Sequence, residues 1–224
     1  MKLKIILGFG VLVIVGIAGY FSFFNNTVLA DTDITIPADL SESDKQFYMK
    51  SWQDVLNAKD HGKNDSGLYN DIGIIRSGLK DYDGAIRAFK KALSLNSDDP
   101  RFKRNLATTY VDLSDYVNAE KWFKEVFADR PTQPEYWLDL VDLYRYQLKD
   151  NSKAKAFFEE ALIKSGEHLE VVKSYAVFSM DVLKDYSTSL KYWQMLAERD
   201  TDPTHKLDYQ TTIANLKLKS GRFE

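Results

Sequence analysis

The sequence lacks cysteine altogether and has only three histidines among its 224 residues. Without cysteine the chain can form no disulfide, no thiol nucleophile, no cysteine-ligated zinc site and no lipidated cysteine. His61, His168 and His205 are far apart in the sequence, and none has a second ligand or a carboxylate at metal-binding spacing. We therefore expect no metal site, no cofactor and no histidine base.

An excess of basic charge is also missing. All 33 acidic residues follow position 30, where they outnumber 28 lysines and arginines, so this part carries a net charge of −5. Nucleic-acid binding requires a basic face, and we expect none here. The sequence contains no nucleophile elbow, no paired-histidine zinc motif and no calcium loop, so we predict that the protein is not an enzyme.

What the chain does have is one long apolar segment near its beginning. Residues 5–24 form a run of 20 residues without a charge, which as a helix at about 1.5 Å per residue spans a hydrocarbon core of about 30 Å. Lys2 and Lys4 precede it and Asp31 follows it, and this asymmetry places the N-terminus in the cytoplasm. We predict that residues 1–30 are a signal anchor in the cell membrane, with the rest of the chain on the extracytoplasmic side.

A cleaved signal peptide is the alternative for this leader, because Ala30 ends a stretch that a signal peptidase could read. The domain would then be secreted rather than anchored. With or without cleavage, we expect the domain to be exported from the cytoplasm. Residues 31–40 are polar, contain Pro37 and show no helical period, so we expect an extended linker.

Self-similarity dominates the remainder of the chain. A shift of 34 residues aligns DYDGAIRAFKKAL, at 81–93, with DYVNAEKWFKEVF, at 115–127. A period of this length, with aromatic and small residues in the same places, indicates stacked helical repeats. The matched pairs are Tyr82 with Tyr116, Ala85 with Ala119, Phe89 with Phe123, and Pro100 with Pro134.

This pattern resembles the tetratricopeptide repeat, in which a small residue, an aromatic four positions later and a small residue three further on line the second helix of a pair. Ala85, Phe89 and Ala92 fit it fully. The third copy, Ala154-Phe158-Ala161, is displaced by one residue, which we assign to the turn at 148–152, and the fourth copy is weaker. The resemblance covers four repeats, at 66–99, 100–133, 134–169 and 170–203.

The resemblance implies an all-α fold, a right-handed superhelix of antiparallel helix pairs following the transmembrane helix. A single pair cannot bury its apolar face, whereas stacked pairs can, and the ends of the stack need covers. Residues 41–65 start with capping residues and carry apolar side chains, which predicts an N-terminal capping helix. Residues 204–224 are predicted to hold the C-terminal capping helix.

The family binds protein segments in a concave groove lined by the first helix of each repeat. Carried over to this chain, the groove contains Asn70, Ile74, Arg101, Arg104, Asn105, Thr108, Asp112, Glu135, Leu138, Asp139, Asp142 and Phe178. Of the carboxylate clamp used by some members only Asn105 matches, while Glu135 and Asp139 have the opposite charge. We expect the two arginines to face the acidic cluster, which suits a segment of mixed charge and not an acidic tail.

These features predict a membrane-anchored scaffold or adaptor that binds a protein or peptide outside the cytoplasm. Fold alone does not select the biological process. A self-associating structural subunit of an envelope or secretion complex, and so a homo-oligomer, is the alternative within the same class. An enzyme acting on envelope polymers is the alternative from another class, and it would require a closed pocket with convergent polar groups.

Overall fold

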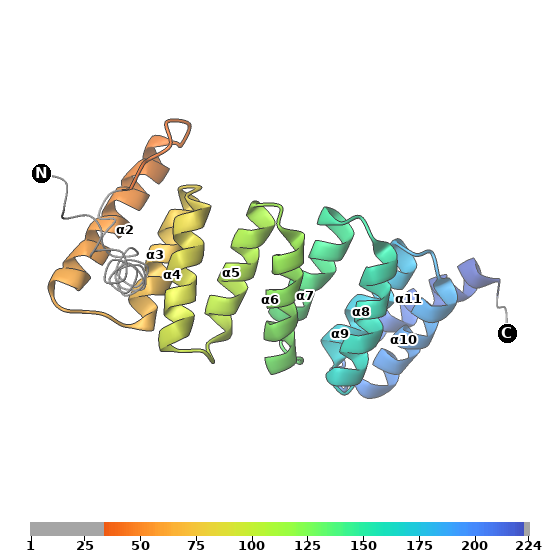
Figure 1. The fold of residues 1–224 in the computed structure, drawn as a ribbon. Coiled ribbons are helices and arrows are strands. Elements are labelled where there is room, and N and C mark those ends of the chain that lie inside the picture. Colours follow the sequence, from red (N-terminus) through yellow and green to blue (C-terminus); the bar gives the residue numbers. More distant parts are fainter. Residues whose placement is uncertain (1–33, 222–224) are drawn as a thin grey trace, which may run out of the picture. The chain divides into compact units, whose positions relative to one another are not determined.

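The computed structural model describes residues 34–221, and this part of the chain is built of helices without a strand (Figure 1). None of its helices is long and apolar enough to cross a membrane, and the predicted anchor at 1–30 lies outside the described residues. The α-helices are α2 (Glu42–Asp60), α3 (Ser66–Gly78), α4 (Tyr82–Leu95), α5 (Pro100–Asp112), α6 (Tyr116–Asp129), α7 (Pro134–Asp142), α8 (Asn151–Lys164), α9 (Leu169–Asp181), α10 (Tyr186–Arg199) and α11 (Lys206–Ser220).

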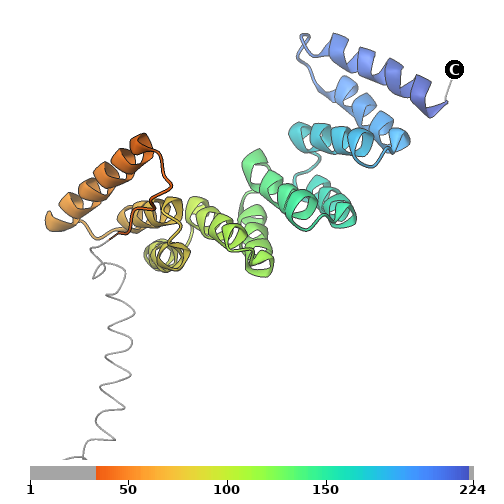
Figure 2. The same cartoon turned by 90° about the horizontal axis from the view of Figure 1, so that it is seen from above.

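The helices form two compact units, which divide after Ser114. In the first unit α3 packs against both α2 and α4, and α4 packs against α5. In the second, α10 packs against both α9 and α11, and the view from above shows α10 between them (Figure 2). Antiparallel helices joined by short turns thus recur along each unit, as the tetratricopeptide resemblance implies.

The same turn joins the two helices of every repeat. It consists of a leucine, a residue with positive φ and an aspartate that caps the next helix by accepting a hydrogen bond from the backbone N–H three positions on. The positive-φ residues are not glycines, so the fixed turn geometry outweighs their conformational preference. These turns are Leu79-Lys80-Asp81, Leu113-Ser114-Asp115, Leu148-Lys149-Asp150 and Leu183-Lys184-Asp185.

The repeat pattern marks the core. Ala85, Phe89 and Ala92 on α4 are at most 1% exposed, because small residues let the paired helices approach while the ring fills the space between turns. The equivalent residues on the other second helices are also buried: Ala119 and Phe123; Ala154, Phe158 and Ala161; Ser189, Trp193 and Leu196.

The extra residue of the third repeat lies in a helix and not in the turn at 148–152, where we had placed it. α7 continues directly into the π-helical segment η1 (Leu143–Gln147), in which the N–H of Leu148 donates to the carbonyl of Leu143 at 3.0 Å. A π turn adds one residue to a helix without lengthening the following turn. The insertion therefore leaves the repeated turn intact and displaces the residues at the end of the first helix.

Part of the predicted linker lies within the described residues. Residues 34–37 have no regular secondary structure, but Ile34, Ile36 and Leu40 pack against the core cluster to which α2, α3, α4 and α5 contribute. Asp39 accepts a hydrogen bond from Lys80 at 3.0 Å. The described part of the linker is thus held on the first repeat, because isoleucine side chains gain more from burial than an extended linker gains from chain freedom.

The two terminal helices cover their neighbours with one face. Trp52 and Val55 of α2 are buried against α3, and Tyr209 and Leu216 of α11 are buried against the repeats before them. Phe47 of α2 is 63% exposed, and Leu207 and Leu218 of α11 are 71% and 60% exposed. The outer faces of both helices therefore retain apolar side chains.

Candidate functional site

A pocket of about 300 Å³ opens on the second unit between the first helices of the third and fourth repeats, and we call it the α7–α9 groove. Its apolar surface comes from both helices, with Leu138 on α7 and Val177 on α9 each more than a third exposed. The lining residues are Leu138, Val141, Asp142, Arg145, Phe158, Glu170, Lys173, Ser174, Val177, Phe178, Asp181 and Val182.

Aromatic rings form the base of the groove. Phe178 is 2% exposed and its ring centroid lies 5.1 Å from that of Phe158, which stacks on Tyr175 at 5.2 Å. The ring centroid of Trp137 lies 5.9 Å from that of Phe158. Because these rings are packed from several directions, the base of the groove is rigid and an apolar side chain can bury itself there without rearranging the core.

Arg145 extends over this aromatic base from η1. Its guanidinium carbon is 5.4 Å from the ring centroid of Phe178 and 4.8 Å from that of Tyr146. Such cation–π contacts hold an arginine in place while its planar face and N–H groups stay usable. Within residues 34–221 the guanidinium has no carboxylate within 4.0 Å, so its N–H donors are available to a ligand.

Acidic side chains line the same groove without a cationic partner. Three carboxylates form no ion pair and no side-chain hydrogen bond among the described residues: Asp142, Glu170 and Asp181. Lys173, which also lines the groove, forms no ion pair within the same part of the chain. Partial burial raises the pKa of Asp142; Arg145 lowers it and Asp139 raises it further. Asp142 is itself exposed to solvent, so a cation that approached it would meet an accessible carboxylate beside the apolar surface of the groove.

Several of the predicted groove residues of the first unit already have hydrogen-bond partners within that unit. Asn105 donates its side-chain N–H to the Asn70 amide oxygen at 2.9 Å, and this bond links the first helices of the first two repeats. Arg101 is bound by Asp99 through two hydrogen bonds of 2.6 and 3.0 Å. The Thr108 hydroxyl donates to the carbonyl of Arg104, and partial burial raises the pKa of Asp112.

Ile74 belongs to a different pocket, between α2 and α3, where it is 48% exposed. Of the predicted residues in the second unit, Leu138, Asp142 and Phe178 lie together in the α7–α9 groove. Glu135 is exposed and Asp139 half-buried on the same helix, outside the lining set. The expected opposition of the two arginines to this acidic cluster spans both units and stays a prediction.

Sequence reasoning missed Arg145, Glu170, Lys173 and Val177 as groove residues. A signal existed for Arg145, since Leu138, Asp142 and Arg145 follow each other at the four- and three-residue spacing of one helix face. The π turn obscured it, because the strict 34-residue shift no longer applies at the end of this helix. Among residues 34–221 no three His, Asp or Glu side chains are grouped so that they could hold a metal ion.

The repeats also match models of a known protein family. Two family models, both described as tetratricopeptide repeat, match residues 78–144 and 134–162. The chain thus contains tetratricopeptide repeats, the helix-pair units whose stacking creates surfaces for protein binding. Among curated proteins, the human NatA auxiliary subunit N-alpha-acetyltransferase 16 is 28% identical over 103 residues, which are 42% of this chain. The chain spans 12% of that protein's length.

Several solved structures are similar to this chain. PilF of Pseudomonas aeruginosa is 15% identical and aligns over 92% of this chain and 93% of its own, with a TM-score of 0.50. MamA of Desulfovibrio magneticus RS-1, from its residue 41 onward, is 17% identical over 81% of this chain and 96% of its own, with a TM-score of 0.48. YrrB, described as a TPR protein with an unusual peptide-binding site, is 15% identical over 76% of this chain and 85% of its own, with a TM-score of 0.45. The likeness to PilF is one of fold.

Proposed function

We propose that this protein is a membrane-anchored tetratricopeptide-repeat scaffold that binds a segment of another protein in the α7–α9 groove, on the extracytoplasmic side of the cell membrane. The observation that carries the proposal is the combination of a rigid aromatic base with unpaired charges of both signs around it. Asp142, whose pKa is raised by partial burial, is one of these charges.

The chemistry of the groove defines the segment that fits. An apolar side chain of the partner would pack against Val177 and Leu138 above the Phe178 ring. A lysine or arginine would pair with Asp142 or Asp181, and a carboxylate or backbone carbonyl would accept from Arg145. Such a segment has mixed charge, since the cations that line this groove are Arg145 and Lys173 and the acidic groups are Asp142, Glu170 and Asp181.

Neutralising the groove carboxylates should weaken partner binding without unfolding the protein. For Asp142→Asn with Asp181→Asn we expect a loss of about 1 to 2 kcal/mol in binding free energy, or about five- to thirtyfold in affinity, because a cation of the partner would lose both of its counter-charges. The measurement is capture of partner proteins from detergent-solubilised membranes at low and high salt. The thermal melt should change by no more than about 0.5 kcal/mol in unfolding free energy.

The matched control is Glu198→Gln with Asp208→Asn, which removes two exposed carboxylates from α10 and α11 outside the groove. It removes the same net charge from the same unit. If both double variants reduced capture equally, the effect would come from total charge and the α7–α9 groove would not be the binding site.

Topology is tested separately. An alkaline phosphatase fused after Glu224 should be active, because the lysines before the apolar run hold the N-terminus in the cytoplasm. Replacing Lys2 and Lys4 by glutamate and Asp31 and Asp33 by lysine should reduce that activity, since the charge bias is reversed. An inactive fusion beside an active cytoplasmic reporter at the same position would refute the extracytoplasmic assignment.

A further inference from the structure

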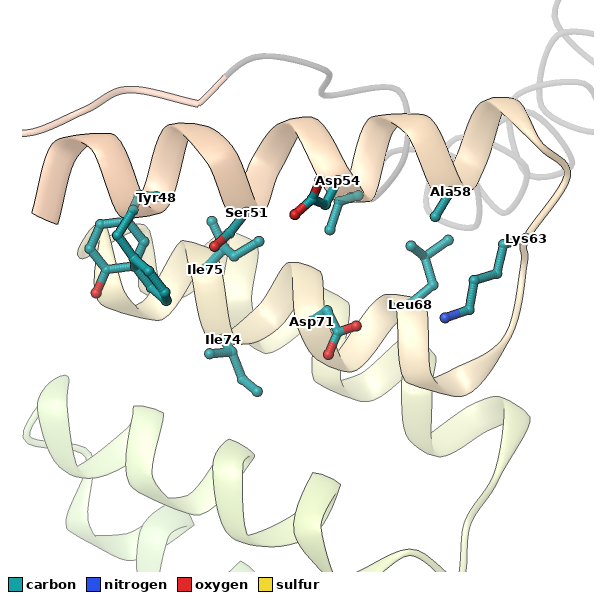
Figure 3. A pocket seen from close by; sticks show the side chains of 11 residues that line it. Tyr48, Ser51, Asp54, Ala58, Lys63, Leu68, Asp71, Ile74 and Ile75 are labelled. Carbon is teal, nitrogen blue, oxygen red and sulfur yellow. The ribbon is translucent and has the colours of Figure 1, made fainter.

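A second pocket, of about 400 Å³, lies in the first unit between α2 and α3, and we call it the α2–α3 groove (Figure 3). One wall is α2, on which Phe47, Ser51, Asp54 and Ala58 follow each other at intervals of three or four residues. These positions share one helix face and extend over about 16 Å, at about 1.5 Å per residue. The groove is thus long enough to take several turns of a helix.

Apolar side chains, two carboxylates and one cation line the α2–α3 groove. The cation, Lys63, stands at the end near Leu68 and away from Tyr48, and it pairs with Asp65 at 4.0 Å (Figure 3). Phe47 and Ile74 are 63% and 48% exposed, and they leave an apolar surface uncovered. Next to them one carboxylate stands on each wall, Asp54 on α2 and Asp71 on α3 (Figure 3). Neither carboxylate has an ion pair or a side-chain hydrogen bond among residues 34–221. A fitting ligand therefore carries an apolar side chain flanked by cations.

The last described helix of the same chain has this chemistry on its outer face. Leu207 and Leu218 of α11 are 71% and 60% exposed, and their spacing of 11 residues puts them on one face and about 16 Å apart. Leu218 is flanked by Lys217 and Lys219, which diverge by about 100° to either side of it on the helix. Over the whole of α11 three lysines stand against one aspartate.

We propose that α11 of one copy of this protein docks in the α2–α3 groove of a second copy. Leu218 packs between Phe47 and Ile74, while its two flanking lysines meet Asp54 and Asp71 on the opposite walls. The apolar stripe of α11 and the α2 wall of the groove match in length as well as in chemistry. This interface joins different surfaces of the two copies, so repetition of the contact adds copies head to tail and extends a chain of molecules.

The absence of cysteine permits a direct test on the full chain in detergent. Two single-cysteine variants are mixed and oxidised: Ser51→Cys in the groove wall and Ala214→Cys on the exposed face of α11, one turn before Leu218. We expect a disulfide-linked dimer of the two variants. The control replaces Ala214→Cys by Asn215→Cys, which is exposed on the same helix but about 80° from Leu207 and about 60° from Leu218 around the helix axis.

Charge exchange makes the test specific. Asp54→Lys with Asp71→Lys in the Ser51→Cys copy should lower cross-linking to the level of the control pair, and Lys217→Glu with Lys219→Glu in the other copy should restore it. Restoration also shows that the variants are folded. Equal cross-linking of the test and control pairs, or a failure of charge exchange to restore it, overturns the proposal.

An intramolecular contact is distinguished by a single chain that carries both cysteines. At high dilution it should remain un-cross-linked if the partner is a second copy, whereas rapid formation of a cross-linked monomer overturns the proposal. All of these variants leave the α7–α9 groove unchanged, so the outcome is independent of the proposed scaffold function.

Discussion

Phe158→Ala is expected to be the most damaging single substitution in the second unit, with a loss of about 3 to 5 kcal/mol in unfolding free energy. Phe158 is 2% exposed and contacts three other rings, those of Trp137, Tyr175 and Phe178. Truncation leaves a cavity that these rigid neighbours cannot fill. A thermal or denaturant melt followed by circular dichroism measures the effect.

The same helix supplies the control. Ile163 on α8 is 81% exposed, and Ile163→Ala should change the unfolding free energy by no more than about 0.5 kcal/mol. Phe158 also lines the α7–α9 groove, so partner capture should fall together with stability in the first variant only. Indistinguishable melts for the two variants would mean that the aromatic base is not packed as described.

Gly73→Ala should destabilise the first unit, although alanine is the better helix former. A Cβ at this position would lie 2.6 Å from Cδ1 and 2.7 Å from Cζ of Phe89, whose ring is 1% exposed and cannot move aside. Overpacking of this kind costs about 1 to 3 kcal/mol, against a gain in helix propensity of up to about 1 kcal/mol. A melt of the variant against the parent protein gives the balance.

Two further variants make this prediction specific. Gly67→Ala in the same helix meets only the Asp65 carboxylate, at 3.3 Å, and should be close to neutral. Combining Gly73→Ala with Phe89→Leu should cost less than the sum of the two single changes, because the smaller side chain relieves the contact. Strict additivity would contradict the close approach of α3 and α4 at Gly73.

The sequence predicts the repeats well because close packing of helices decides which residue types occupy the repeated positions. Gly73 and Ala85 are small where helices approach, and Phe89 fills the space that they leave. Hydrophobic periodicity and the 34-residue shift therefore locate the helices and the buried positions. The helix caps follow in the same way, since an aspartate precedes each second helix and accepts its N–H bond.

Two features of the structure could not be predicted in this way. The extra residue of the third repeat is compatible with a longer turn or with a π turn, and only the packing of α7 and η1 against α8 selects the second. The placement of Ile34 and Ile36 on the first repeat depends on contacts between distant parts of the sequence. Periodicity reports local geometry, and both cases are decided by tertiary packing.

The candidate groove was predicted only in part for a related reason. Leu138 and Asp142 follow from the repeat register, whereas Arg145 depends on the π turn that breaks it. Charge pairing is also invisible in the sequence, because Arg101 turns out to be bound by Asp99 while Arg145 has no carboxylate partner in the part of the chain that the structure describes. Which charges remain for a partner is thus a structural result.

Site-specific photo-cross-linking in intact membranes tests the binding site most directly. A photoreactive residue replaces Leu138, which is 39% exposed at the α7–α9 groove, or Val117 on α6, which is 81% exposed and outside it. We predict an adduct with a partner protein from position 138 that is absent from position 117 and is lost when Asp142→Asn and Asp181→Asn are added. An adduct from position 117 but not from 138, or one from 138 that survives both carboxylate substitutions, would contradict the assignment of the groove.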